Sequence, residues 1–243
     1  MSSKPRLWTK GFILDTLVNF LIYIIYYMLM VIIASEAIHS LHASMSEAGL
    51  ASGIFILGTL VARLFAGRSV ELYGRRKMLF AGILFYLATT FMYFGIHSMA
   101  MLYLVRCLNG IGYGIASTAT STIVSTMIPA ERRGEGINYY ALSMSLAAAI
   151  GPFIGMLMQQ IFPFKDIIYF CIAMIVVCLG AAAVMHVEEM ELTEEHRAAL
   201  KEIHIANFLE PKVTAISIVA FCVAVCYSSV LSFLASYAAE LQL

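Results

Sequence analysis

Charged residues are scarce in this chain of 243 residues: they make up 12% of it, whereas a typical soluble domain contains about 25%. Apolar residues supply 61% of the sequence, and the mean hydropathy is +0.88. This scarcity of charge excludes an ordinary soluble domain and is typical of a protein embedded in lipid. Because the formal net charge is zero, the distribution of charge along the chain is more informative than its total.

The sequence also lacks a nucleotide-binding loop, a cleavable signal peptide and a disulfide framework. Without a glycine-rich phosphate-binding motif, ATP is not expected to be the direct energy source. The first apolar stretch is too long for a signal-peptide core and no small-residue cleavage site follows it, so we expect it to remain as an anchor. The cysteines are odd in number and lie within apolar stretches, at Cys107, Cys171, Cys178, Cys222 and Cys226.

Long apolar stretches are abundant instead. A transmembrane helix needs about 20 predominantly apolar residues, whereas a barrel shows alternating segments of about ten. The sequence therefore predicts an all-α membrane protein. The expected spans are 11–34, 45–67, 78–96, 99–127, 137–161, 166–186 and 213–238.

Lysine and arginine are unevenly distributed among the connections between these spans. Twelve lie before the first span or in every second connection after it, and only Lys165 lies on the opposite side. Because basic residues concentrate on the cytoplasmic side, we expect the N-terminus in the cytoplasm. A seven-helix receptor or photoreceptor, the rival from another class, would place its N-terminus outside.

An internal similarity links the two ends of the chain. Residues 17–37 align without a gap on residues 218–238, with six identical positions, so the seventh span is expected to restart the pattern of the first. The segment between them is polar, with seven Glu and three His in residues 186–212. A solvated linker explains that segment better than a metal site, since no ligand pair has the context of a metal motif. We therefore expect a six-helix bundle in 1–186, a cytoplasmic linker in 187–212, and a seventh helix in 213–243 that opens an incomplete second bundle.

The connection between the second and third spans combines glycines and charges. It reads Gly67-x-x-x-Glu71-x-x-Gly74-Arg75-Arg76. This pattern resembles the loop 2–3 motif of the major facilitator superfamily, with glutamate at the place where aspartate is usual. The position of the motif after the second span and the long central linker fit the same family.

Two further patterns extend the resemblance. In the fourth span, Arg106 followed by Gly110 matches the family pattern Arg-x-x-x-Gly. In the fifth span, Gly151-Pro152-x-x-Gly155 resembles a motif associated with antiporters, although the final glycine of that motif is replaced. The resemblance implies a six-helix half-bundle of a major facilitator fold plus one helix of the second half.

The charged connection is expected to form a cytoplasmic latch. Gly67 and Gly74 permit a tight turn, and Glu71 is expected to accept from helix N-terminal amides or to pair with a neighbouring arginine such as Arg132 or Arg133. The alternative is that the basic residues only set the topology and bind lipid headgroups. The expected gating residues are Gly67, Glu71, Gly74, Arg75, Arg76, Arg132 and Glu135.

Polar and aromatic side chains recur at intervals of four along the first span, from Asp15 to Tyr27, and we expect this stripe to form one face of a helix. It is expected to meet a face of the fourth span that carries hydroxyl groups, so that the two line a polar cavity. Arg106 lies well inside an apolar span, so it is expected to face the bundle interior and meet tyrosines of the first span or backbone carbonyls, unless it snorkels to the outer interface. Asp15 is the only carboxylate well within a span, and it either carries a proton or pairs with Lys10. The expected cavity residues are Asp15, Asn19, Tyr23, Tyr27, Arg106 and Tyr113.

Pro152 is expected to act as a hinge. It removes one backbone hydrogen bond and allows a bend, while Gly151 and Gly155 supply a smooth packing face. The alternative is an ordinary packing kink.

These features together predict a secondary active transporter and not an enzyme. The resemblance favours proton-coupled efflux of drug-like or amphipathic compounds from a bacterial plasma membrane. Two alternatives remain: a sugar, nucleoside or metabolite transporter of the same superfamily, and a truncated inactive fragment. The expected partners are a small-molecule substrate, protons, the lipid bilayer and a missing C-terminal half, without a cofactor, a metal or a nucleic acid.

Overall fold

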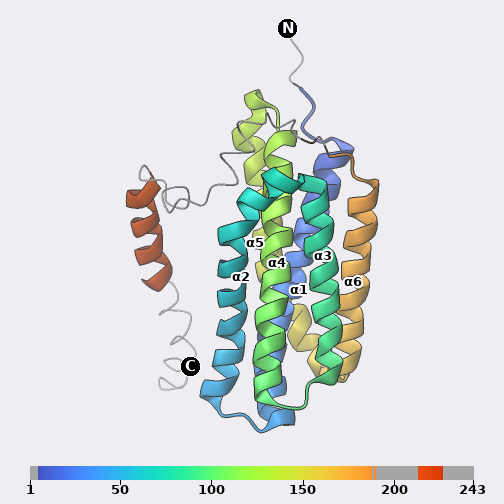
Figure 1. The fold of residues 1–243 in the computed structure, drawn as a ribbon, viewed down its shortest axis with the longest axis vertical. Helices are drawn as coiled ribbons and strands as arrows, with labels where there is room; N and C mark the ends of the chain where they lie inside the picture. Colours follow the sequence, from blue (N-terminus) through green and yellow to red (C-terminus); the bar gives the residue numbers. More distant parts are fainter. Residues whose placement is uncertain (1–4, 188, 190–212, 227–243) are drawn as a thin grey trace. The chain divides into compact units, whose positions relative to one another are not determined.

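The computed structural model describes residues 5–187, 189 and 213–226. Six α-helices run side by side along one axis and are joined by short connections (Figure 1). Two short 3-10 helices, η1 Met92–Gly95 and η2 Ala130–Arg132, precede α4 and α5. The α-helices are α1 Lys10–Leu41, α2 Met45–Tyr73, α3 Arg75–Phe91, α4 Met99–Met127, α5 Arg133–Ile161 and α6 Phe164–Val184.

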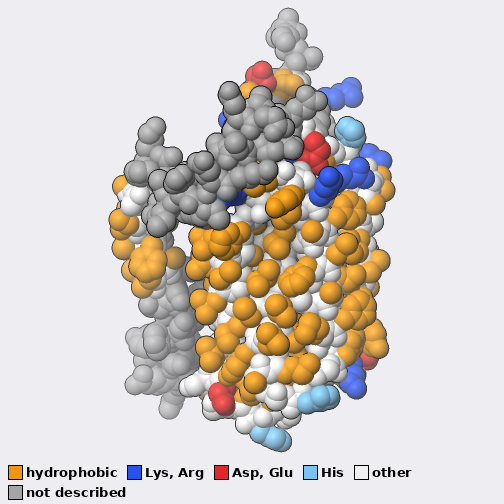
Figure 2. Space-filling model, viewed as in Figure 1, with side chains coloured by type: hydrophobic (Ala, Val, Ile, Leu, Met, Phe, Trp, Pro, Cys, Tyr) orange, Lys and Arg blue, Asp and Glu red, His pale blue; other side chains and the backbone are white. Residues whose placement is uncertain are grey.

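Each of these six helices is long and apolar enough to cross a membrane. Figure 2 shows hydrophobic side chains covering the middle of one face of the bundle, with charged and histidine side chains towards its two ends. The six-helix prediction is thus confirmed. We call the end where α1 begins and α2 ends the basic end, since it carries Arg68, Arg75, Arg76, Lys77, Arg132 and Arg133.

Helices α1, α2 and α5 extend beyond the predicted spans because polar residues at their ends still favour helix, whereas α4 has the predicted bounds and α6 ends two residues before its predicted end. Thr9 Oγ1 accepts a hydrogen bond from the amide of Phe12 and so caps α1. At α2, Ser44 and Glu47 form a reciprocal capping box, in which each side chain accepts from the backbone amide of the other. The connection between the predicted spans 45–67 and 78–96 is shorter than expected: α2 continues through Tyr73, and Gly74 alone separates it from α3.

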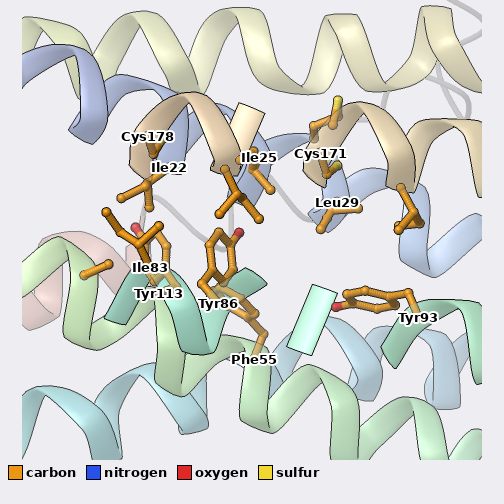
Figure 3. Packing of buried hydrophobic residues seen from close by; sticks show 14 of the residues in the cluster. Ile22, Ile25, Leu29, Phe55, Ile83, Tyr86, Tyr93, Tyr113, Cys171 and Cys178 are labelled. Carbon is orange, nitrogen blue, oxygen red and sulfur yellow. The ribbon is translucent and has the colours of Figure 1, made fainter. Parts of the chain in front are cut away.

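The core lies where α1 and α4 meet the other helices. α1 packs mainly against α5 and α6, and α4 mainly against α2 and α3. Because lipid is as apolar as these side chains, close packing, more than the hydrophobic effect, holds the helices together. In Figure 3, Tyr86 of α3 and Tyr113 of α4 lie among side chains from α1 and α6, namely Ile22, Ile25, Leu29, Cys171 and Cys178.

Helices α2 and α4 approach each other through glycine. A Cβ atom added to Gly58 would overlap the carbonyl of Cys107, and one added to Gly110 would overlap the carbonyl of Phe55. Only glycine permits this backbone-to-backbone contact. The contact brings Arg106, one turn before Gly110, against the first half of α2.

The chain falls into two compact units, Met1–Thr193 and Glu194–Leu243. In the second unit the structure describes one apolar helix, Val213–Cys226, which begins where the seventh span is predicted. The remainder of that span and the linker residues 190–212 lie outside the described residues. The predicted domain boundaries therefore stay a prediction.

Candidate functional site

A groove of about 450 Å³ runs between α1, α2, α4 and α5. Most of its lining side chains carry a hydroxyl group. They are Tyr23, Arg63, Ser117, Thr118, Ser121, Thr122, Ser125 and Met144. The sequence predicted that polar faces of the first and fourth spans meet in a hydroxyl-lined cavity. The structure places Tyr23 in the groove, but the positive charge of the groove belongs to Arg63 and not to Arg106.

The groove lies in the half of the bundle next to the basic end. Ser117 precedes the end of α4 at Met127 by ten residues, or about 15 Å of helix. Tyr23 follows the start of α1 at Lys10 by thirteen residues, or about 20 Å. A solute that enters from the basic end would therefore meet the hydroxyl groups before reaching the middle of the bundle.

Aromatic rings pack behind the groove. The ring of Tyr23 lies 5.4 Å from that of Tyr113, and Tyr113 is 5.0 Å from Tyr26. Tyr26 also stacks on Phe55 of α2 at 5.1 Å, and Tyr27 lies 4.6 Å from Tyr26. Of the predicted tyrosines, Tyr23 therefore lines the groove, while Tyr27 and the buried Tyr113 belong to the cluster that supports it.

Arg106 is fully buried, as predicted, but its partners come from α2 and η1. Its Nε donates to the carbonyl of Ala51 at 3.2 Å, its Nη1 donates to the hydroxyl of Tyr93 at 3.4 Å, and its guanidinium lies 4.4 Å from the ring centre of Phe55. Of the two expected kinds of partner, Arg106 meets a backbone carbonyl and not the tyrosines of the first span, because the Gly58–Gly110 crossing brings α2 closer. Arg106 thus stabilises the packing of three elements and does not line the groove.

Asp15 is also fully buried, and neither of its carboxylate oxygens has a hydrogen-bond partner among the described residues. The alternative pairing with Lys10 is wrong, because no ion pair joins these two described residues. A buried carboxyl group without a partner is costly when ionised, so it is held neutral or has a functional role. The hydroxyl of Tyr140 on α5 is within electrostatic reach of Asp15.

A network of hydrogen bonds connects α1, α4 and α5 next to Asp15. Asn19 donates to Ser143 Oγ at 3.1 Å and accepts from Thr120 Oγ1 at 3.3 Å. The Tyr140 hydroxyl donates to Thr120 Oγ1 at 3.0 Å and lies 3.4 Å from Ser121 Oγ. Because Ser121 lines the groove, this network extends from the groove towards the buried acid.

The predicted stripe on α1 does not stay on one face. Residues four apart advance by 400°, so the stripe drifts by about 40° at each step and by about 120° between Asp15 and Tyr27. Asp15 and Asn19 therefore point into the bundle, and Tyr23 reaches the groove.

Gly74 forms the sharp connection between α2 and α3 with a φ of 98°, a conformation that favours glycine. The carboxylate of Glu189, which follows α6, accepts from the backbone amides of Arg75 at 2.8 Å and Arg76 at 3.0 Å. Arg76 Nη2 in turn donates to the carbonyl of Ala183 near the end of α6, at 3.0 Å. Acceptors at a helix start and donors at a helix end both match the helix dipole, so the start of α3 is tied to the end of α6.

The predicted role of Glu71 is taken by Glu189. Glu71 is exposed in the last turn of α2, and no hydrogen bond or ion pair joins it to a described residue. Arg132 pairs instead with Glu135 at 2.6 Å and donates to the carbonyl of Pro5. Gly67 lies within α2, and a Cβ atom there would meet nothing within 4 Å, so its predicted part in a turn is wrong.

The hinge residues lie where α5 crosses α1. α5 is continuous through Pro152, and a Cβ atom on Gly151 would lie 2.7 Å from Tyr27 Cβ, while one on Gly155 would lie 3.1 Å from Met28 Cγ. The two glycines therefore allow close packing. The bending role of Pro152 stays a prediction.

A second pocket of about 550 Å³ lies at the opposite end of the bundle, among the ends of α1, η1 and α6. Its polar lining comes mainly from Glu36, Ser40, His97 and Lys165. We take the groove as the candidate site because it carries the predicted Tyr23 and reaches the buried network. No group of three or more metal-ligating side chains occurs among the residues that the structure describes.

The six membrane-length helices define a multi-pass membrane protein, and a polar groove lies between four of them. Residues 16–243 match the family model of the Major Facilitator Superfamily, and the chain belongs to this family. It is 29% identical over 132 residues to the uncharacterized MFS-type transporter MJ1560 of Methanocaldococcus jannaschii, which covers 54% of this chain and 34% of the relative. It is 23% identical over 184 residues to Multidrug resistance protein 2 of Bacillus subtilis, which covers 74% and 46%.

The fold is similar to that of a solved peptide transporter, a POT mutant in complex with alafosfalin. The TM-score is 0.65 at 18% identity, over 92% of this chain and 46% of the other. The chain thus spans between about a third and a half of the length of the relatives it matches. The sequence predicted six helices of a larger transporter fold, and the fold and the family match confirm this prediction.

Proposed function

We propose that the full-length protein exports amphipathic small molecules across the plasma membrane by alternating access, with inward proton flow as the driving force. The observation that carries the proposal is the groove, where hydroxyl groups and one arginine interrupt an otherwise apolar bundle. By the lysine and arginine distribution the basic end would lie in the cytoplasm, so the groove would take its solute from the cytoplasmic side. The name of the Bacillus subtilis relative, a multidrug resistance protein, supports export of drug-like compounds.

Asp15 is the proposed proton carrier. Its buried carboxyl group has no partner among the described residues, so it is stable in the closed bundle only when it is neutral. Water that enters through the groove would let it ionise, and hydrogen bonds lead from Ser121 in the groove through Tyr140 and Thr120 to Asn19, one helical turn after Asp15. A membrane-embedded acid that alternates between a dry and a wet environment binds and releases a proton in each cycle.

The test uses the full-length protein in inverted membrane vesicles with an acidic interior. Amphipathic dyes of positive, neutral and negative charge are added in turn, and dye accumulation and proton release are followed by fluorescence. The wild type is expected to accumulate at least one dye and to release protons in step with it. Asp15→Asn is expected to abolish this accumulation and to retain dye exchange without a proton gradient.

Asp166→Asn, a change in the first turn of α6 far along the chain from the groove residues, is the matched control and should behave as wild type. Gradient-driven accumulation by Asp15→Asn at the wild-type rate would refute the assignment of Asp15. Failure of the wild type to move any dye would refute export of amphipathic compounds.

A further inference from the structure

Arg63 is the one charged side chain in the lining of the groove. It is exposed, and no hydrogen bond or ion pair links it to any residue that the structure describes. Asp15 and Arg106, which are fully buried, lie outside the groove lining. The groove therefore presents a positive charge with no carboxylate beside it.

The position of Arg63 favours a role inside the groove. It precedes the end of α2 at Tyr73 by ten residues, or about 15 Å of helix. An arginine side chain extended towards the headgroups spans less than half of that distance, and α2 carries a second arginine, Arg68, closer to its end. Arg63 shares the groove with Tyr23, whose ring packs against Tyr113 of the aromatic cluster at 5.4 Å, so it lies beside that cluster.

The neighbours of Arg63 can supply the remaining contacts of an anion. Thr118, Thr122 and Ser125 follow one face of α4 in the groove, at spacings of four and three residues. A guanidinium group binds carboxylate, sulfonate or phosphate oxygens through two parallel hydrogen bonds, and nearby hydroxyls donate to the oxygens that remain. Tyr23 and Met144 line the same groove and offer contact area to an apolar body.

We infer that Arg63 makes the groove selective for amphipathic organic anions, which bind with their acidic group between Arg63 and the α4 hydroxyls and their apolar part against Tyr23 and Met144. The inference rests on the proposed export function and names its substrate class. Neutral compounds of the same shape enter the groove more weakly, since the positive charge then has no partner. Amphipathic cations are repelled.

The test compares dansylglycine, which carries a carboxylate, with dansylglycine methyl ester, which does not. Transport is measured with the full-length protein in inverted vesicles under a proton gradient. Arg63→Gln is expected to raise the KM for dansylglycine about ten-fold or more, because charge-assisted hydrogen bonds are lost, and to change the KM for the ester less than two-fold. Arg63→Lys should lie between, since lysine keeps the charge and loses the paired geometry.

Arg68→Gln, which removes a charge from the same helix outside the groove lining, is the matched control and should leave both KM values unchanged. Equal loss of both probes in Arg63→Gln would overturn the inference by assigning Arg63 a structural role. Preference of the wild type for the ester or for a cationic dye would also overturn it, and the export function would then stand without it. Transport of no dye of any charge would instead refute the export function itself.

Discussion

The close contact between α2 and α4 leads to a sharp prediction for Gly58→Ala. A Cβ atom at this position overlaps the backbone carbonyl of Cys107, which cannot rotate away as a side chain can. Alanine favours helix over glycine by about 1 kcal/mol. Overpacking costs about 1–3 kcal/mol, and the rigid obstacle places this case at the upper end, so we expect a net loss of about 2 kcal/mol.

Gly53→Ala is the matched control on the same helix. A Cβ atom at Gly53 meets nothing within 4 Å, so only the gain in helix propensity, at most about 1 kcal/mol, remains. Thermal unfolding of the full-length protein in detergent, followed by tyrosine fluorescence, should show Gly58→Ala about 4–8 °C below wild type and Gly53→Ala at or above it. Equal Tm values for the two variants would refute the backbone contact between α2 and α4, and with it the position of Arg106 against α2.

Three further predictions concern the buried arginine, the end of α3 and the hinge. Arg106→Lys should lower the Tm by several degrees although the charge is kept, because an ammonium group cannot reach Ala51 and Tyr93 while lying on Phe55. Arg68→Lys is the control and should leave the Tm unchanged. Glu189→Ala should cost about 1–2 kcal/mol of stability and speed tryptic cleavage after Arg75 and Arg76, because the cap of α3 is lost. Glu71→Ala should change stability and cleavage little. A larger effect of Glu71→Ala than of Glu189→Ala would refute the assignment of Glu189 as the cap. Pro152→Ala should raise the Tm and slow dye transport, because it restores a helix hydrogen bond within α5 and removes the bend. Unchanged transport would show that Pro152 serves packing and not bending.

The membrane helices were predictable because their signal is physical and local. About 20 apolar residues in a row have few alternatives to a membrane span, and all six spans before the linker are helices in the structure. The interior position of Arg106 was predictable for a similar reason, since a charge at that depth is too costly in lipid. Some helix ends were less predictable, because α1 continues to Leu41 and α2 to Tyr73, several residues beyond the apolar stretches from which their spans were predicted.

The partners of the site residues were not predictable from one helix at a time. Periodicity places a residue on a face but does not say which neighbouring helix that face meets. The sequence therefore offered the tyrosines of α1 or a backbone carbonyl as partners of Arg106, and only the glycine crossing with α2 brings it to the carbonyl of Ala51 and to Phe55.

Two functional candidates were missed altogether for the same reason. Arg63 is a single charge in a long apolar run, and its importance depends on the groove that α4 forms beside it. Glu189 is one of seven glutamates in the polar segment 186–212, and only the chain path after α6 singles it out as the cap of α3. Glu71 belongs to the recognised sequence motif, but it lies in the last turn of α2, where no free backbone amides are available to donate hydrogen bonds to it.

The most direct test of the account asks whether the groove is the solute path. In the full-length protein with its native cysteines replaced, Ser121→Cys places a thiol in the groove, and Val176→Cys places one on the exposed side of α6. The account predicts that a water-soluble thiol reagent modifies Ser121→Cys, that a transported dye protects it, and that Val176→Cys stays unmodified in lipid. A Ser121→Cys thiol that is inert, or one that the transported dye does not protect, would contradict the central claim.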